Sequence, residues 1–268
     1  MSSTNTIILD TIVLEVMDLQ GPDRRNIHEI HIAHPDFQFR PGQFVMVKKN
    51  CGPTSWAYPY MIQQKTGQGF TVWAVGKSSL ADAEPGLSLT VWGANGRPVG
   101  SESALVVCEA ATWFLAAPVF NNIPGCRALL LNPSGDDGYL SGCGRLTSVR
   151  DISQMAVEIA RRTEGISGEP DGLSGVSARQ PGSPSPQIIA ALNIPALLAL
   201  VKEAPQLDTG RLSIFAGTKI SCGVNGCKSC YLHSRDLPLG ISVCCNGPYL
   251  PFDKVDFELD QRCFYTFD

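Results

Sequence analysis

The segment Cys222-Gly223-Val224-Asn225-Gly226-Cys227-Lys228-Ser229-Cys230, with Cys244 following after thirteen further residues, is the most informative part of this chain. Its C-x4-C-x2-C…C spacing is the plant-type order of thiolate ligands for a [2Fe–2S] cluster. Gly223 and Gly226 are expected to let the loop curl with positive φ, so that backbone N–H groups point at the cluster sulfurs. The sequence therefore predicts that Cys222, Cys227, Cys230 and Cys244 hold a [2Fe–2S] cluster, a group that moves single electrons.

Two alternatives stay open for these thiols. A structural zinc site also takes four thiolates, but it usually shows two C-x2-C pairs, whereas this chain has one such pair and the adjacent Cys244 and Cys245. The other alternative is a set of structural thiols without a metal. Cys245 is the alternative fourth ligand to Cys244. The remaining cysteines are expected to be buried small apolar residues: Cys51, Cys108, Cys126, Cys143 and Cys263.

The composition is that of an ordinary globular protein, with 268 residues, 44% hydrophobic residues, 17% charged residues and a net charge of −4. This length allows two compact domains and a small third module. The negative net charge and the lack of a basic stretch argue against nucleic acid as a partner. Because a cluster needs thiolates, we expect a cytoplasmic protein in a reducing environment. The polar N-terminus predicts no signal peptide, and the lack of a long apolar run predicts no membrane span.

Residues 1–100 are expected to form a small antiparallel β-barrel, because short β-branched or aromatic runs alternate there with turn residues. The expected strands are Ile7–Val16, Asn26–Ala33, Gln43–Lys48, Gly69–Val75 and Ser88–Trp92.

Residues 101–215 alternate between strand-like and helix-like patterns, which predicts an α/β domain. A loop rich in Gly, Ser and Pro is expected at residues 169–187. Residues 216–268 are expected to form the cysteine module. The expected strands of the α/β domain are Ala104–Cys108, Ala128–Asn132 and Ile188–Leu192, and its expected helices are Thr112–Phe120, Ser148–Arg162 and Ala196–Glu203.

Several short motifs resemble those of the ferredoxin-reductase superfamily. They are Pro41-Gly42-Gln43-Phe44-Val45, Gly93-Ala94-Asn95-Gly96, Cys244-Cys245-Asn246-Gly247-Pro248 and Asp253-Lys254-Val255-Asp256-Phe257. With its order of barrel, α/β domain and cluster module, the chain most resembles the iron–sulfur electron-transfer subunit of class B dihydroorotate dehydrogenase and sulfide-dehydrogenase-like proteins. The resemblance implies a barrel that binds FAD, an α/β domain that binds NAD, and a cluster that passes electrons to a partner.

The flavin motifs depart from the pattern of that family. Its R-P-x-S motif is matched here by Tyr58, Pro59, Tyr60 and Met61, which removes the Arg that would pair with the flavin pyrophosphate. Its second phosphate turn, G-x-G-T, is matched by Gly76-Lys77-Ser78-Ser79, which retains a hydroxyl. FAD is therefore expected to be absent or loosely held, with weak candidate contacts at Tyr58, Tyr60, Ser78 and Ser79. Trp56, Tyr58 and Tyr60 are expected to fill the flavin pocket rather than to stack on a remaining cofactor.

The nicotinamide motifs depart further. The family places a Gly-rich turn after the first α/β strand, where the backbone approaches the dinucleotide closely. This chain has Cys108-Glu109-Ala110-Ala111-Thr112-Trp113 at that position, so side chains occupy the space and Glu109 adds a repelling charge. The C-G-P motif that borders the nicotinamide is replaced by Ala191-Leu192-Asn193. NAD(P) is therefore not expected to bind.

These observations favour an iron–sulfur electron-transfer subunit of a larger cytoplasmic oxidoreductase, with the substrate chemistry on another chain. The expected partner is a second redox subunit, a flavoprotein, in a hetero-oligomer. Residues around Gly223–Ser229 and Asn246–Tyr249 are expected at that interface, and apolar Val224, Tyr249, Leu250 and Phe252 form either a contact surface or the core of the module. Two alternatives are a self-contained NAD(P)H-dependent FAD/[2Fe–2S] reductase and a structural or regulatory subunit whose cluster only stabilises the fold.

Overall fold

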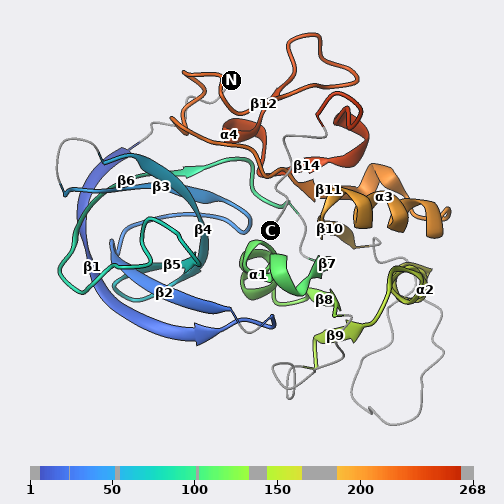
Figure 1. The fold of residues 1–268 in the computed structure, drawn as a ribbon, viewed down its shortest axis with the longest axis horizontal. Helices are drawn as coiled ribbons and strands as arrows, with labels where there is room; N and C mark the ends of the chain where they lie inside the picture. Colours follow the sequence, from blue (N-terminus) through green and yellow to red (C-terminus); the bar gives the residue numbers. More distant parts are fainter. Residues whose placement is uncertain are drawn as a thin grey trace.

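The computed structural model describes residues 7–23, 25–51, 55–100, 103–132, 144–164 and 186–260, and its first part is a closed antiparallel β-barrel (Figure 1). The strands follow in the spatial order β1-β2-β5-β4-β3-β6. The barrel confirms the sequence prediction and adds β4, a strand that the sequence analysis did not identify. The bounds are β1 Ile7–Gln20, β2 Asn26–Ala33, β3 Phe44–Lys49, β4 Ala57–Lys65, β5 Gly69–Val75 and β6 Ser88–Asn95.

Alternation along the barrel strands divides side chains between the interior and the outer surface. In β3, Val45 and Val47 face the interior core of the barrel and are fully buried. Phe44 and Met46 lie on the other face of the same strand and belong to a core that continues into the C-terminal half of the chain. The barrel therefore has a buried outer face, and the later elements pack on it.

The second part is an α/β arrangement, as the sequence predicted (Figure 1). Its sheet has six strands, of which the sequence analysis identified β7, β8 and β10 but not β9, β11 and β14. The strand order is β14-β11-β10-β7-β8-β9, and all neighbouring pairs are parallel except β11 with β14. The strands are β7 Ala104–Glu109, β8 Arg127–Leu131, β9 Leu146–Val149, β10 Gln187–Ala191, β11 Leu212–Phe215 and β14 Tyr249–Pro251. The helices are α1 Trp113–Asn122, α2 Ile152–Glu164 and α3 Ile194–Glu203, with short 3₁₀ turns η1 Ala110–Thr112 and η2 Thr209–Arg211.

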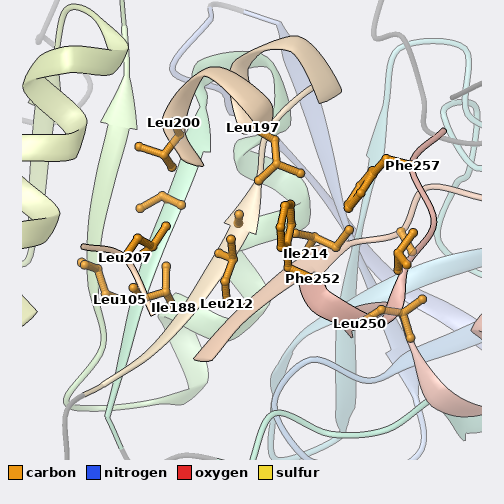
Figure 2. Close-up of a cluster of buried hydrophobic side chains, with 14 of the residues drawn as sticks. Leu105, Ile188, Leu197, Leu200, Leu207, Leu212, Ile214, Leu250, Phe252 and Phe257 are labelled. Atoms are coloured by element: carbon orange, nitrogen blue, oxygen red, sulfur yellow. The ribbon is translucent and has the colours of Figure 1, made fainter. Parts of the chain in front are cut away.

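The two faces of this sheet are covered by different helices. Val106 and Cys108 of β7 point to the side covered by α1. Leu105 and Val107, the alternate residues, point to the side covered by α2 and α3. Figure 2 shows this second core, in which Leu197 and Leu200 of α3 lie over the sheet residues Leu105, Ile188 and Leu212.

The C-terminal residues are continuous with the sheet. The hairpin β12 Tyr231–Leu232 with β13 Ile241–Ser242 leads into the short helix α4 Val243–Asn246, then into β14 and the 3₁₀ turn η3 Phe252–Lys254. The buried side chains of this region, Cys230 and Cys244 among them, belong to the same core as α2 and α3. Strand β14 thus joins the cysteine-rich region to the edge of the α/β sheet.

This arrangement decides between the two alternatives for the apolar residues near Cys244, because three of the four are core residues and do not form a contact surface. Tyr249 is 6% exposed, Leu250 1% and Phe252 8%, because β14 and η3 bury these side chains against β11. The Tyr249 hydroxyl donates to the Leu115 carbonyl oxygen in α1. Of the four residues considered, Val224 alone lies on the surface, with 47% exposure.

Motifs that are far apart in the sequence meet at one junction. The Arg97 N–H donates to the Gly247 carbonyl oxygen at 2.7 Å, and the Gln43 side chain donates to the Gly96 carbonyl oxygen at 2.9 Å. Gly96 has φ +81°, and a Cβ there would lie 2.2 Å from the Gly247 oxygen. A backbone hydrogen bond therefore joins the barrel exit to the tail after Cys244, and a side-chain hydrogen bond joins the barrel exit to the residue before β3.

The other cysteine expectations are only partly met. Cys108 and Cys126 are buried, as expected, but Cys51 is exposed because it lies beyond the end of β3. Cys143, Cys263 and residues 169–185 of the expected loop lie outside the described residues. No helix in the described part of the chain is long and apolar enough to cross a membrane.

Gly96→Ala is expected to lower the free energy of unfolding by about 2–4 kcal/mol, because left-handed strain adds to a steric clash with the backbone at Gly247. Gly86→Ala is the matched control, since Gly86 has φ +88° and no neighbour within 4 Å of an added Cβ. It should cost only the strain, about 1–2 kcal/mol. Urea unfolding of both variants measures the difference, and equal losses would contradict the role given to the junction.

Candidate functional site

The cysteine loop is tightly curled by residues with positive φ, but these are not all the residues that the sequence analysis expected. Gly223 has φ 72° as expected, while Gly226 is not in the left-handed region. Asn225 and Lys228 adopt the left-handed backbone conformation instead, with φ of 62° and 57°. Residues other than Gly and Asn seldom adopt this conformation. This curl brings backbone N–H groups to the sulfurs. The Val224 N–H lies 3.4 Å from the Cys222 sulfur, and the Asn225 N–H lies 3.2 Å from the Cys244 sulfur.

The four predicted ligands lie as two pairs of thiols. The Cys227 N–H donates to the Cys222 sulfur at 3.5 Å, and the Cys244 N–H donates to the Cys230 sulfur at 3.4 Å. A [2Fe–2S] cluster takes two protein ligands on each iron, so this division of the donors fits that group.

Hydrogen bonds lower the pKa of one thiol in each pair. Hydrogen bonds, first from the Ser229 side chain and then from its backbone and Cys222, lower the pKa of Cys227 to about 7. Hydrogen bonding, first from Cys230 and then from Ser242, lowers the pKa of Cys244. The side-chain hydrogen bond with Cys244, followed by burial, raises the pKa of Cys230, because the Cys230 thiol is the proton donor in that bond. Thiolates are the form that binds iron.

Structural zinc is the alternative metal for these thiols, and it takes four donors around one ion. Within the described ranges, no three His, Cys, Asp or Glu side chains are grouped closely enough to hold a metal ion. The choice between zinc and a cluster therefore stays a prediction. Cys245, the alternative ligand, is exposed and its sulfur lies 3.9 Å from that of Cys244.

The loop is fixed on the buried outer face of the barrel. The Trp92 indole N–H donates to the Cys222 carbonyl oxygen at 2.9 Å. A Cβ on Gly223 would lie 2.5 Å from the Met46 side chain, so only glycine allows this close approach. The cysteine loop is therefore held against β3 and β6 by a hydrogen bond and by close packing.

Tyr60 occupies the turn that the family resemblance assigns to a flavin phosphate. Its hydroxyl lies 2.6 Å from the Ser78 hydroxyl and 2.7 Å from that of Ser79, and it accepts the Leu80 N–H at 3.1 Å. Burial raises the pKa of Tyr60, so the phenol stays neutral. The groups that could cradle an anion are thus already hydrogen bonded to a side chain of the protein.

Of the three aromatic residues expected to fill the flavin pocket, Tyr60 alone is buried. Tyr60 is 7% exposed, whereas Tyr58 is 46% and Trp56 77% exposed. The expectation that all three fill a pocket is therefore wrong for Trp56 and Tyr58, because the start of β4 projects into solvent. Tyr58 supplies neither a charge nor a buried ring at the position of the family's Arg.

The two altered nicotinamide motifs contact each other directly. The Glu109 carboxylate accepts the Asn193 backbone N–H at 3.0 Å and the Asn193 side-chain amide at 2.6 Å. Burial raises the pKa of Glu109. The Thr112 hydroxyl also donates to the Ala191 carbonyl oxygen. These bonds bridge the carboxyl ends of β7 and β10, where open α/β sheets bind their ligands.

Comparison with known proteins supports the fold. No family model and no curated protein matches the chain. A solved structure described as the NADH-dependent reduced ferredoxin-NADP oxidoreductase of flavin-based electron bifurcation is similar over 98% of this chain and 94% of its own, with 14% identity and a TM-score of 0.66. The ferredoxin-NADP+ reductase from Plasmodium falciparum with 2'P-AMP is similar over 76% of this chain and 94% of its own, with 8% identity and a TM-score of 0.51.

The ferredoxin reductase in carbazole 1,9a-dioxygenase is similar over 80% of this chain and 68% of its own, with 14% identity and a TM-score of 0.50. The chain shares the fold of these solved structures, a barrel followed by a parallel-sheet α/β domain. The finer resemblance to the dihydroorotate dehydrogenase subunit stays a prediction.

His233, three residues after Cys230, is expected to titrate above its ordinary pKa. Its Nδ1 lies 2.8 Å from the buried Asp260 carboxylate, whose hydrogen bond and charge, followed by the charge of Asp256, raise the pKa of His233. A raised folded-state pKa stabilises the fold fully below the unfolded value of about 6.5, and this contribution is lost as the pH rises through the folded value. NMR titration of His233 should show the raised pKa, and Asp260→Asn should return it towards 6.5. An unshifted His233 in the parent protein would contradict the pairing.

Proposed function

We propose that this chain is an iron–sulfur electron-transfer subunit of a larger oxidoreductase. The observation that carries the proposal is the division of Cys222, Cys227, Cys230 and Cys244 into two thiol pairs, with backbone N–H groups directed at their sulfurs. This donor set suits a [2Fe–2S] cluster, which supplies one-electron exchange when bound. The ferredoxin-reductase fold agrees with such a role.

The residues around the thiols have distinct tasks in this proposal. Cys230 and Cys244 are buried, which shields their side of the site from water, whereas Cys227 is exposed and faces the surroundings of the molecule. The Val224 and Asn225 N–H groups stabilise negative charge on sulfur and so favour the reduced form. An exposed thiol with a lowered pKa, such as that of Cys227, suits a reducing compartment such as the cytoplasm.

The nucleotide sites support a relay rather than a self-contained reductase. Tyr60 is bonded to the phosphate turn, and Glu109 is bonded to Asn193 across the ends of β7 and β10. The first arrangement occupies the Ser78 and Ser79 hydroxyls and the Leu80 N–H, and the second occupies the Asn193 N–H, which are donors that a dinucleotide phosphate could otherwise use. We propose that this chain uses neither FAD nor NAD(P), and that a partner subunit carrying a flavin performs the two-electron chemistry.

The cluster is tested by analysis of the anaerobically purified protein. Iron and acid-labile sulfide should each be present at about two per chain, with an EPR signal after reduction. Cys230→Ser should lose the visible absorption and destabilise the C-terminal region, because ligation supplies folding free energy. Cys245→Ser is the matched control, since its thiol adjoins a ligand but is exposed, and it should keep the spectrum. Zinc, or four irons per chain, would overturn the assignment.

Nucleotide binding is tested by titration calorimetry with NADH and NADPH at ~1 mM, where no saturable heat is expected because Glu109 blocks the turn. FAD should be lost on gel filtration. Glu109→Ala removes the bridge to Asn193, and if that bridge closes the site, this variant should bind NADH more tightly than the parent does. A micromolar dissociation constant for the parent, or stoichiometric FAD after gel filtration, would favour the self-contained reductase instead.

A further inference from the structure

We propose that the Ser242 hydroxyl donates a hydrogen bond to the Cys244 thiolate when the cluster is bound, and that this bond raises the reduction potential of the cluster. The inference rests on the proposed function, because the hydroxyl has this role only when Cys230 and Cys244 hold a cluster. It goes beyond that function by naming the side chain that controls how readily the buried side of the site accepts negative charge.

Ser242 lies beside both of the buried thiols. The residue is 4% exposed. Its hydroxyl oxygen lies 3.3 Å from the Cys244 sulfur and 3.8 Å from the Cys230 sulfur. A metal-bound thiolate carries no proton, whereas the hydroxyl carries one, so Ser242 is the donor once the cysteines act as ligands. The shorter of the two distances assigns that proton to Cys244.

The helix that follows Ser242 does not use this hydroxyl. Ser242 is the N-cap residue of α4, a position at which serine usually accepts a backbone N–H from the first helical turn. Its side chain makes no capping hydrogen bond. The Cys244 N–H, one of the groups that a cap would bind, donates instead to the Cys230 sulfur at 3.4 Å. The hydroxyl is therefore left for the sulfurs, and helix capping does not account for a serine at this position.

Ser229 is the corresponding hydroxyl at the exposed pair of thiols, and its surroundings differ. Its oxygen lies 3.1 Å from the Cys227 sulfur. The residue is exposed, and its hydroxyl also donates to the Ser221 hydroxyl at 3.1 Å and to the Lys219 carbonyl oxygen at 3.5 Å. Its one proton thus has several acceptors, and water replaces it at the sulfur when it is removed. A buried hydrogen bond is electrostatically stronger than an exposed one, so we assign the larger effect on the potential to Ser242.

The direction of the effect follows from charge. Reduction adds one negative charge to the cluster and its thiolates, and hydrogen bonds donated to the sulfurs stabilise the reduced form more than the oxidised form. Loss of the Ser242 hydroxyl should therefore lower the equilibrium constant for reduction, by about three- to tenfold, where tenfold corresponds to about 59 mV for one electron. The Asn225 N–H also donates to the Cys244 sulfur and stays in place, so the effect is partial.

The experiment measures the reduction potential of the full-length, cluster-loaded protein by spectroelectrochemistry. Ser242→Ala removes the hydroxyl, and α4 should persist because the side chain does not cap it. Ser242→Gly is a second variant without the hydroxyl, and Ser242→Thr retains a hydroxyl at the same position. Ser229→Ala is the matched control, because it makes the same deletion beside the exposed Cys227.

We expect Ser242→Ala and Ser242→Gly to lower the potential, Ser242→Thr to stay near the parent value, and Ser229→Ala to give the smaller shift. Electron–nuclear double resonance of the reduced protein should show one exchangeable proton fewer in Ser242→Ala than in the parent, with that proton retained in Ser242→Thr.

Equal potentials in Ser242→Ala and the parent, or equal shifts in Ser242→Ala and Ser229→Ala, would overturn the proposal. Failure of both hydroxyl-free variants to load the cluster would also overturn it, because Ser242 would then have a structural role instead. A parent protein without a [2Fe–2S] cluster would refute the proposed function itself, so the two failures are told apart by the visible spectrum of the parent.

Discussion

The contact between the barrel exit and the tail after Cys244 is the constraint on which the rest of the structure depends. Gly96 lies so close to Gly247 that no side chain fits between their backbones, and the Arg97 N–H bonds to the Gly247 oxygen. This junction fixes the tail at a definite distance from β3 and β6, to which the cysteine loop is bonded through Trp92. The relative position of Cys244 and the loop cysteines follows from these two attachments.

The four predicted ligands come from two different parts of the structure. Three come from a loop held on the barrel, and the fourth comes from α4, which is packed in the core of the α/β sheet. The Asn225 N–H donates to the Cys244 sulfur and the Cys244 N–H donates to the Cys230 sulfur, so hydrogen bonds cross between the two sources in both directions. The site therefore depends on the docking of barrel and sheet as much as on the loop.

Elements were predicted correctly from the sequence where the spacing of apolar residues matches that of a strand or of a helix, but not both. Strands β2 and β5 were predicted with their observed bounds, because β-branched alternation is bounded there by turn residues. Strand β4 was missed because Pro59 argues against a strand interior and the surrounding residues were considered only as a cofactor motif. The first residues assigned to helix Ser148–Arg162 belong partly to β9, so α2 begins at Ile152. Spacing along the chain predicted the ligand set but not which thiols adjoin each other. The Tyr60 and Glu109 contacts join residues far apart in sequence, which no local pattern records.

Strand β14 has a consequence for how the chain matures on the ribosome. The outer edge of β11 is completed only by β14, which follows β11 by more than thirty residues. During synthesis that edge stays open until β14 has emerged, and an open strand edge of apolar residues is a template for unwanted pairing. The strand that closes the edge follows Cys244 and α4 directly. The last of the four predicted ligands therefore enters the fold together with the strand that protects the sheet edge.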